Sequence, residues 1–251
     1  MSDGFGALIL AGSRGGVDPV AAYGGASHKA LILLEGQTLL ARVAQALRDA
    51  GATRIAVSVS DDAVRAHASE LGLTVLTAAT GPSLSVRDGI AALGTPLLVT
   101  TADHALLRPA WITRFLHDAP PAADVAALLA RRDVIEAAAP GTRRTYLRFA
   151  DGAWSGCNVF HFATPRSIAA LDLWAQVEAD RKRPWRIVRR LGIGTLLRYL
   201  SGRLTLVEAI AHLGRLAGLD AAAVTSPFGL AAVDVDKPAD LDLVRTLVET
   251  R

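Results

Sequence analysis

Short apolar segments rich in Val, Ile and Leu alternate with longer segments of helical periodicity over the first half of the chain, and this alternation constrains the fold most strongly. It is typical of β-α-β units, which build a mainly parallel sheet with helices on both faces. Such a Rossmann-like, doubly wound α/β sheet binds its ligand beyond the carboxyl ends of the strands, near the point where the strand order reverses. Thr38 and Asp61 are expected to cap two of the helices, which Gly51 and Gly72 end. The strands are predicted at 7–11, 54–58, 74–76, 96–100 and 126–130, and the helices near 38–50, 63–71, 85–92 and 109–117.

The second half of the chain departs from this alternation. Residues 145–149 and 159–162 predict an antiparallel excursion, and residues 165–218 have helical periodicity. The segment 230–241 predicts a strand, a turn and a last helix. Because no repeat or low-complexity linker divides the chain, we expect a single domain over residues 1–251, with 165–218 as a helical insertion or flap within it.

The composition excludes several other classes of protein. No apolar stretch of the 251 residues reaches the length of a membrane span, and the N-terminus lacks the basic and apolar segments of a secretory signal. Cys157 is the single cysteine, so the chain forms no internal disulfide, which fits a reducing cytoplasm. The formal net charge of +3 is too small to argue for nucleic-acid binding. We therefore expect a cytoplasmic protein of ordinary enzyme size.

A glycine-bearing loop follows the first predicted strand. It reads Ala11-Gly12-Ser13-Arg14-Gly15-Gly16, and Lys29 comes fifteen residues after Arg14. Lysine is rare in this chain, since only three of its 27 basic residues are lysines. Small residues let backbone N–H groups approach phosphate oxygens, and the cations neutralise the remaining charge. The loop matches neither the P-loop nor the dinucleotide fingerprint, so alone it fits a phosphate cradle or a simple turn.

Acidic residues stand near the ends of two other predicted strands. Asp103 follows the strand 96–100, where a carboxylate can ligate Mg²⁺ or cap the next helix. Asp234 and Asp236 alternate along the last predicted strand, which would direct both toward one cation. Asp236 is the better placed of the two as a ligand, although it could also cap the final helix. Together with the loop, these acids indicate a magnesium-nucleotide site.

The ordered set of motifs resembles the MobA-like nucleotidyltransferases, whose fold is like that of the A-type glycosyltransferases. The resemblance spans most of the chain, although the segment 17–27 is longer than in many relatives and the glycine pair after Ala11 is reduced to Gly12-Ser13. The segments that carry it are Leu10-Ala11-Gly12-Ser13-Arg14-x-Gly16, His28-Lys29-Ala30-Leu31, Gly36-Gln37-Thr38-Leu39-Leu40, Thr101-Ala102-Asp103 and Asp234-Val235-Asp236-x-Pro238-x-Asp240-Leu241.

The resemblance implies roles for individual residues. Arg14 would contact the β and γ phosphates of a nucleoside triphosphate, Lys29 would lie near its α phosphate, and Asp103 and Asp236 would ligate Mg²⁺. Ser85 would meet the nucleobase or, equally, cap the helix before Val86. The implied ligands of the donor nucleotide are Ala11, Gly12, Ser13, Gly15, Gly16, Ser83 and Ser85.

The implied activity is Mg²⁺-dependent transfer of a nucleoside monophosphate from a nucleoside triphosphate, CTP or GTP, to a phosphorylated small molecule, with release of pyrophosphate. Arg14, Lys29 and Asp103 would be the catalytic residues, because the dense negative charge of the transition state must be compensated. An acceptor phosphate is already ionised at neutral pH, so no protein nucleophile is required. Two alternatives stay open: a glycosyltransferase that uses a nucleotide sugar, although Thr101-Ala102-Asp103 lacks the first acid of an Asp-x-Asp motif, and a non-catalytic nucleotide-binding regulator.

The acceptor side is represented by Asn158 and a basic segment. Asn158 lies where relatives bind the acceptor, and a role as a turn residue fits it comparably well. Eight basic residues and no acidic residue occur in the segment 181–207. We favour a flap over an anionic acceptor, with Arg186, Arg189 and Arg190 as ligands, over a solvated helix face and, third, a peripheral membrane contact. Nucleic acid is not an expected partner, because no binding motif accompanies the charge, and homo-oligomer formation is left open.

Overall fold

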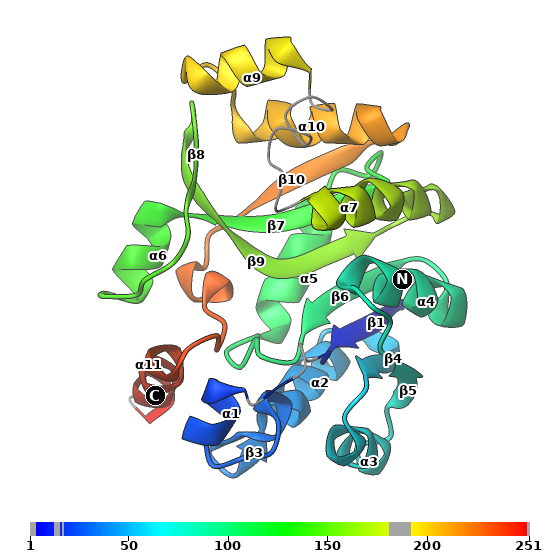
Figure 1. Ribbon diagram of the computed structural model, residues 1–251, viewed down its shortest axis with the longest axis vertical. Coiled ribbons are helices and arrows are strands. Elements are labelled where there is room, and N and C mark those ends of the chain that lie inside the picture. The colour runs from blue at the N-terminus through cyan, green and yellow to red at the C-terminus, as the bar shows by residue number, and fades with distance from the viewer. Residues whose placement is uncertain (1–3, 13–15, 17, 181–191, 250–251) are drawn as a thin grey trace.

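The computed structural model consists of a mixed sheet flanked by helices on both faces (Figure 1). This architecture confirms the predicted Rossmann-like α/β class. The structure describes residues 4–12, 16, 18–180 and 192–249. None of the helices in these ranges combines the length and apolarity that a membrane crossing requires. Six residues for which the sequence predicts roles lie outside the described residues: Ser13, Arg14, Gly15, Arg186, Arg189 and Arg190.

The sheet places its first strand near the middle. Strand β1 pairs in parallel with β4 and β6, whereas β9 is antiparallel to β6 and β7. The chain winds outward from β1 to β5 and then crosses to β6 on the other side, so the strand order reverses between β1 and β6. Across the sheet the order is β10 (Ala221–Ser226), β7 (Val125–Arg131), β9 (Gly152–Phe162), β6 (Leu97–Thr101), β1 (Phe5–Leu10), β4 (Ala52–Val59) and β5 (Thr74–Thr77), with β8 (Leu147–Phe149) paired to β9.

Helices cover the two faces because successive side chains of each strand point to opposite sides. Leu8 and Ile9 of β1 are both completely buried, and they belong to separate apolar clusters. The cluster of Ile9 includes side chains of α2 (Leu39–Asp49), α3 (Asp62–Glu70) and α5 (Pro109–Asp118). The cluster of Leu8 includes side chains of α4 (Pro82–Leu93) and α7 (Ile168–Asp180). Helices α9 (Ile193–Leu200) and α10 (Leu206–Ala217) form a layer at the top of Figure 1.

The capping residues act as the sequence predicts. The Oγ1 atom of Thr38 accepts a hydrogen bond from the N–H of Ala41, and Oδ1 of Asp61 accepts one from the N–H of Val64. Glycines with positive φ follow the ends of both helices. Short elements connect β1 to α2: α1 (Pro19–Tyr23), the 3₁₀ helix η1 (Lys29–Leu31), and the hairpin of β2 (Leu33–Leu34) and β3 (Gln37–Thr38).

The C-terminal part is where the predicted elements need correction. The antiparallel excursion is confirmed by β8 and β9, but the strand expected around 230–236 is wrong. That apolar segment forms the 3₁₀ helix η3 (Gly229–Ala232) and then an extended segment before α11 (Pro238–Glu249). The sheet position beside β7 is taken by β10, an alanine-rich strand that periodicity did not reveal. A short helix, α6 (Arg132–Ala138), follows β7.

Candidate active site

The candidate site lies at the carboxyl ends of β1 and β6, where the strand order reverses. The N–H of Ala102 donates to the carbonyl oxygen of Leu10 at 3.0 Å, so the two strand ends are held side by side. Ala11 and Gly12 follow β1, and Asp103 follows β6. A ligand in this crevice would therefore meet both the glycine-bearing loop and an acid, as expected for a doubly wound sheet.

Lys29 reaches into this crevice from the first residue of η1. Its Nζ donates to Oδ2 of Asp103 at 2.5 Å and to Oδ1 of Asp236 at 3.2 Å. Burial lowers the pKa of Lys29, but the charges and hydrogen bonds of the two acids outweigh burial and raise that pKa to about 12. Lys29 is therefore a fixed cation at neutral pH. His28 starts the 3₁₀ helix, because its Nδ1 accepts a hydrogen bond from the N–H of Ala30 at 3.0 Å.

The two acids that meet Lys29 come from separate loops that are tied together. The Oγ1 atom of Thr101 donates to Oδ1 of Asp103, and the carbonyl oxygen of Asp103 accepts a hydrogen bond from the N–H of Val235 at 3.1 Å. The side chain of Asp103 is 12% exposed and that of Asp236 is 58% exposed. Solvent thus reaches the pair from the side of Asp236.

Neither acid serves as the helix cap that the sequence left open. Helix α5 begins at Pro109 with Arg108 as its capping residue, five residues beyond Asp103. At the start of α11, Oδ2 of Asp240 accepts hydrogen bonds from the N–H groups of Asp236 and Lys237. The side chain of Asp240 therefore supports the turn, while the carboxylate of Asp236 faces Lys29.

Asp234 is more buried than Asp103 and Asp236, and its carboxylate is bonded to Arg144 and Asn158 rather than to Lys29. That it approaches one cation together with Asp236 stays a prediction. Oδ1 of Asp234 accepts a hydrogen bond from Nη1 of Arg144, and its Oδ2 accepts one from Nδ2 of Asn158 at 2.5 Å. The side chains of Arg144 and Asp234 are 12% and 6% exposed. Burial opposes the charge of Arg144, but Asp234 outweighs this effect and raises the pKa of Arg144. No spacing or motif in the sequence identifies Arg144 as a partner of Asp234.

Asn158 lies at an irregularity of β9. Its φ of 52° is left-handed, a conformation that Asn tolerates better than most residues. The register between β7 and β9 shifts between Ala127 and Leu129, opposite this residue. The bulge turns the amide toward Asp234, so Asn158 is neither in a simple turn nor on a regular strand. Its contact with an acceptor stays a prediction.

The residues expected to meet the nucleotide differ in how accessible they are. Gly12 and Gly16 are exposed, and Gly16 has a φ of 106° that suits glycine. Ser83 and Ser85 are buried on the first turns of α4, with 1% and 4% exposure. The helix begins at Pro82, so Ser85 is not its cap; its Oγ accepts a hydrogen bond from the N–H of Ala79 at 3.0 Å. Their contact with a nucleobase stays a prediction.

Asp103 and Asp236 fit the ligand chemistry of a divalent cation. Both offer carboxylate oxygens to one shared cationic atom, the Nζ of Lys29, which stands where a metal ion would also be attracted. Within the described ranges, no group of three or more His, Cys, Asp or Glu side chains could hold a metal ion. Mg²⁺ commonly takes one or two carboxylates and completes its shell with water and substrate phosphates, so a pair of carboxylates is compatible with its ligand chemistry.

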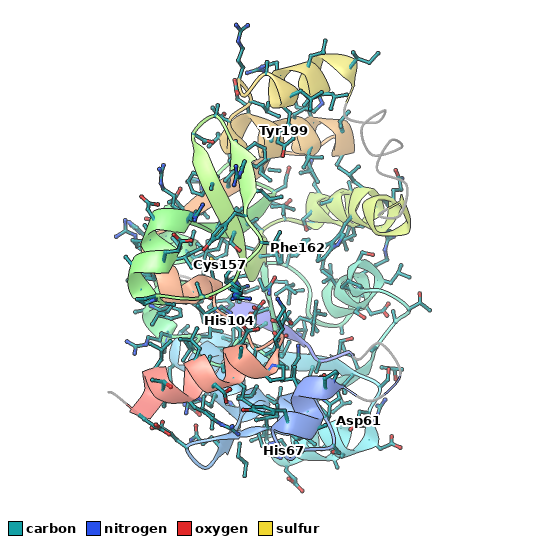
Figure 2. The ribbon with its side chains drawn as sticks, turned by 60° about the vertical axis from the view of Figure 1, so that its left-hand side comes forward. Asp61, His67, His104, Cys157, Phe162 and Tyr199 are labelled. Atoms are coloured by element: carbon teal, nitrogen blue, oxygen red, sulfur yellow. The ribbon has the colours of Figure 1, made fainter. Side chains whose placement is uncertain are left out.

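Two reactive side chains near the site are buried and unsuited to covalent chemistry. Burial raises the pKa of the Cys157 thiol, and burial lowers the pKa of His104 to about 4. Figure 2 shows both side chains near the middle of the molecule. A neutral thiol and a neutral imidazole at pH 7 agree with a reaction that requires no protein nucleophile.

The comparison with solved structures agrees with this geometry. The doubly wound sheet that carries the candidate site is also the fold of solved nucleotidyltransferases. A hypothetical transferase from Thermus thermophilus is similar to the chain, with 28% identity and a TM-score of 0.81 over 95% of this chain and 100% of that one. A nucleotidyl transferase from Methanothermobacter has 20% identity and a TM-score of 0.59 over 98% of each chain.

The family assignment follows from the sequence match. Residues 7–192 match the model of the MobA-like NTP transferase domain, so the chain belongs to this family and is a nucleotidyltransferase. The fold is also that of CMP:2-keto-3-deoxy-manno-octonic acid synthetase in complex with CTP, with 18% identity and a TM-score of 0.59 over 98% of this chain and 99% of that one. No curated protein matches the chain.

Proposed function

We propose that this enzyme transfers a nucleoside monophosphate from CTP or GTP to a phosphorylated small molecule, with Mg²⁺ as cofactor and pyrophosphate as the second product. The observation that carries the proposal is the convergence of Lys29, Asp103 and Asp236 at the strand-order reversal, beside the glycine-bearing loop. One cation and two carboxylates suit a reaction in which the protein positions phosphate groups and compensates their charge. Such a reaction does not require a covalent bond to the protein.

The reaction needs only positioning and charge compensation from the chain. An oxygen of the acceptor phosphate forms a bond to the α-phosphorus, the bond from that phosphorus to the bridging oxygen breaks, and pyrophosphate leaves with the electron pair. Lys29 would stabilise the charge that develops around the α-phosphate. The backbone N–H groups of Gly12 and Gly16 would hold the leaving phosphates. A bound Mg²⁺ ion would supply further charge neutralisation, with Asp103 and Asp236 as its protein ligands.

Of the residues predicted to meet the acceptor, the structure describes Asn158. Asn158 lies next to Asp234, and its Nδ2 is already bonded there, so an acceptor would meet the remaining surface of this residue. The predicted contacts of Arg186, Arg189 and Arg190 with an anionic acceptor lie outside the described residues. The acceptor is accordingly a small molecule that carries a phosphate.

Pyrophosphate release tests the proposal. The protein would be incubated with Mg²⁺, each nucleoside triphosphate and a panel of sugar, polyol and alcohol phosphates. We expect release that requires both a triphosphate and one class of acceptor. Lys29→Met and Asp103→Asn should each depress turnover at least about a hundredfold, as expected for groups that stabilise transition-state charge. Lys237→Met, which removes an exposed lysine, is the matched control. Wild-type turnover in Lys29→Met or Asp103→Asn would refute the assignment, and triphosphate binding without any release would favour a regulator.

A further inference from the structure

Lys29 is the counter-cation of both predicted metal ligands. Its Nζ lies 2.5 Å from Oδ2 of Asp103 and 3.2 Å from Oδ1 of Asp236. The two carboxylates carry a formal charge of −2, which the ammonium reduces to −1. Because the side chain of Lys29 is only 22% exposed, water screens its attraction to the two carboxylates less than it would at the surface.

A metal ion bound by the same two acids would meet this ammonium. Like charges a few ångströms apart in a partly buried site repel one another. Asp234 is a third carboxylate that acts electrostatically on both acids, but its own charge is already compensated by Arg144. Two carboxylates that are already half neutralised form a weak site for a strongly hydrated ion such as Mg²⁺.

A triphosphate removes this obstacle. Two carboxylates, one divalent cation and one ammonium sum to a formal charge of +1, which the oxygens of a triphosphate reverse. Phosphate oxygens are also ligands that Mg²⁺ prefers and a natural partner for an ammonium. The ion and the nucleotide therefore each improve the site for the other.

We propose that Lys29 occupies the cation position between Asp103 and Asp236 in the free enzyme, and that a divalent cation binds both acids only together with a triphosphate, which draws the ammonium away from them. The inference rests on the proposed function in one respect, namely that the donor is a triphosphate. It gives Lys29 a task before the reaction begins: it holds the two acids together and keeps the free site from trapping metal ions.

Metal binding without nucleotide tests the first half of the proposal. Mn²⁺ would serve as the probe, and electron paramagnetic resonance would report the free ion. We expect Lys29→Met to bind Mn²⁺ at least about tenfold more tightly than the wild type, because a neighbouring positive charge is removed. Lys237→Met, the control for a general loss of positive charge, should bind like the wild type. The gain should disappear in the double variant Lys29→Met with Asp103→Asn, which locates it at this site.

The outcomes separate this proposal from the proposed function. Equal Mn²⁺ affinity in Lys29→Met and the wild type would overturn the inference, as would a gain that survives Asp103→Asn. The measurement uses no substrate. Its result therefore does not depend on whether any acceptor supports pyrophosphate release. Circular dichroism of each variant establishes that it is folded.

The wild-type protein offers a second readout, for which a variant serves only to assign one signal. The chain has only three lysines, so lysine labelled with ¹⁵N at Nζ gives at most three side-chain signals, and the signal missing in Lys29→Met identifies Lys29. We expect Mg²⁺ alone to leave the Lys29 signal unchanged, and Mg²⁺ with the α,β-methylene analogue of CTP or GTP to shift it. A full shift with Mg²⁺ alone would refute the proposal.

Discussion

The buried ion pair of Arg144 and Asp234 lies next to the candidate site in the chain, because Asp234 precedes Val235 and Asp236. Breaking this pair should lower the free energy of unfolding. Arg144→Met leaves the carboxylate of Asp234 buried with only the amide of Asn158 as a partner. Asp234→Asn leaves the guanidinium of Arg144 without its counter-charge. Because Asp234 precedes Val235, whose N–H binds the carbonyl of Asp103, either change also loosens the segment that carries Asp236.

The magnitude follows from burial. The side chains of Arg144 and Asp234 are 12% and 6% exposed, so water cannot replace the lost partner. Removal of one member of such a pair typically costs about 3–5 kcal/mol of unfolding free energy, because a buried charge is left uncompensated. The double variant removes both charges, and should therefore cost less than the sum of the single variants by about 2 kcal/mol.

Urea unfolding of the wild type, both single variants and the double variant measures this coupling at pH 7. The exposed pair of Arg87 and Asp172, whose side chains are 39% and 65% exposed, provides the control cycle. An exposed pair contributes about 1 kcal/mol or less. A coupling for Arg144 and Asp234 no larger than that of the control pair would refute the reasoning that this network is a buried, interdependent support.

Two further predictions concern buried groups near the site. Burial lowers the pKa of His104 from 6.5 to about 4, so the stabilisation from its neutral form is complete above pH 6.5 and is lost as the pH falls toward 4. Between pH 7 and pH 4.5, the wild type should therefore lose about 2 kcal/mol more unfolding free energy than His104→Gln does. Equal losses in the two proteins would contradict the lowered pKa of His104. Burial raises the pKa of the Cys157 thiol, so a thiol reagent at pH 8 should label it only after denaturation; rapid labelling of the native protein would show that Cys157 is not protected.

The sequence predicts the sheet and part of the site because both depend on local signals. The parallel strands are buried on both faces and therefore read as continuous apolar segments, of which Leu8 and Ile9 are an example. Asp103 could be placed because an acid that follows such a strand must lie at the carboxyl edge of the sheet. Lys29 and Asp236 could be added because their motifs resemble those of a family.

The remaining features depend on contacts between distant segments. Arg144 and Asp234 are 90 positions apart in the sequence, and no spacing predicts that they pair. The alanine-rich strand β10 has little β propensity of its own and forms through its pairing with β7. The apolar segment before Asp234 resembles a strand by composition, yet β10 already occupies the sheet position beside β7, so this segment packs as η3 instead.

The fate of the α-phosphate tests the central claim most directly. With Mg²⁺, an active acceptor and CTP or GTP labelled at the α-phosphorus, we predict that the label moves to the phosphorylated acceptor and that the released pyrophosphate is unlabelled. Lys29→Met and Asp103→Asn should form this product at least about a hundredfold more slowly, and Lys237→Met at the wild-type rate. Label that remains in free nucleotide, or transfer of a γ-label to the acceptor, would contradict nucleotidyl transfer at this site.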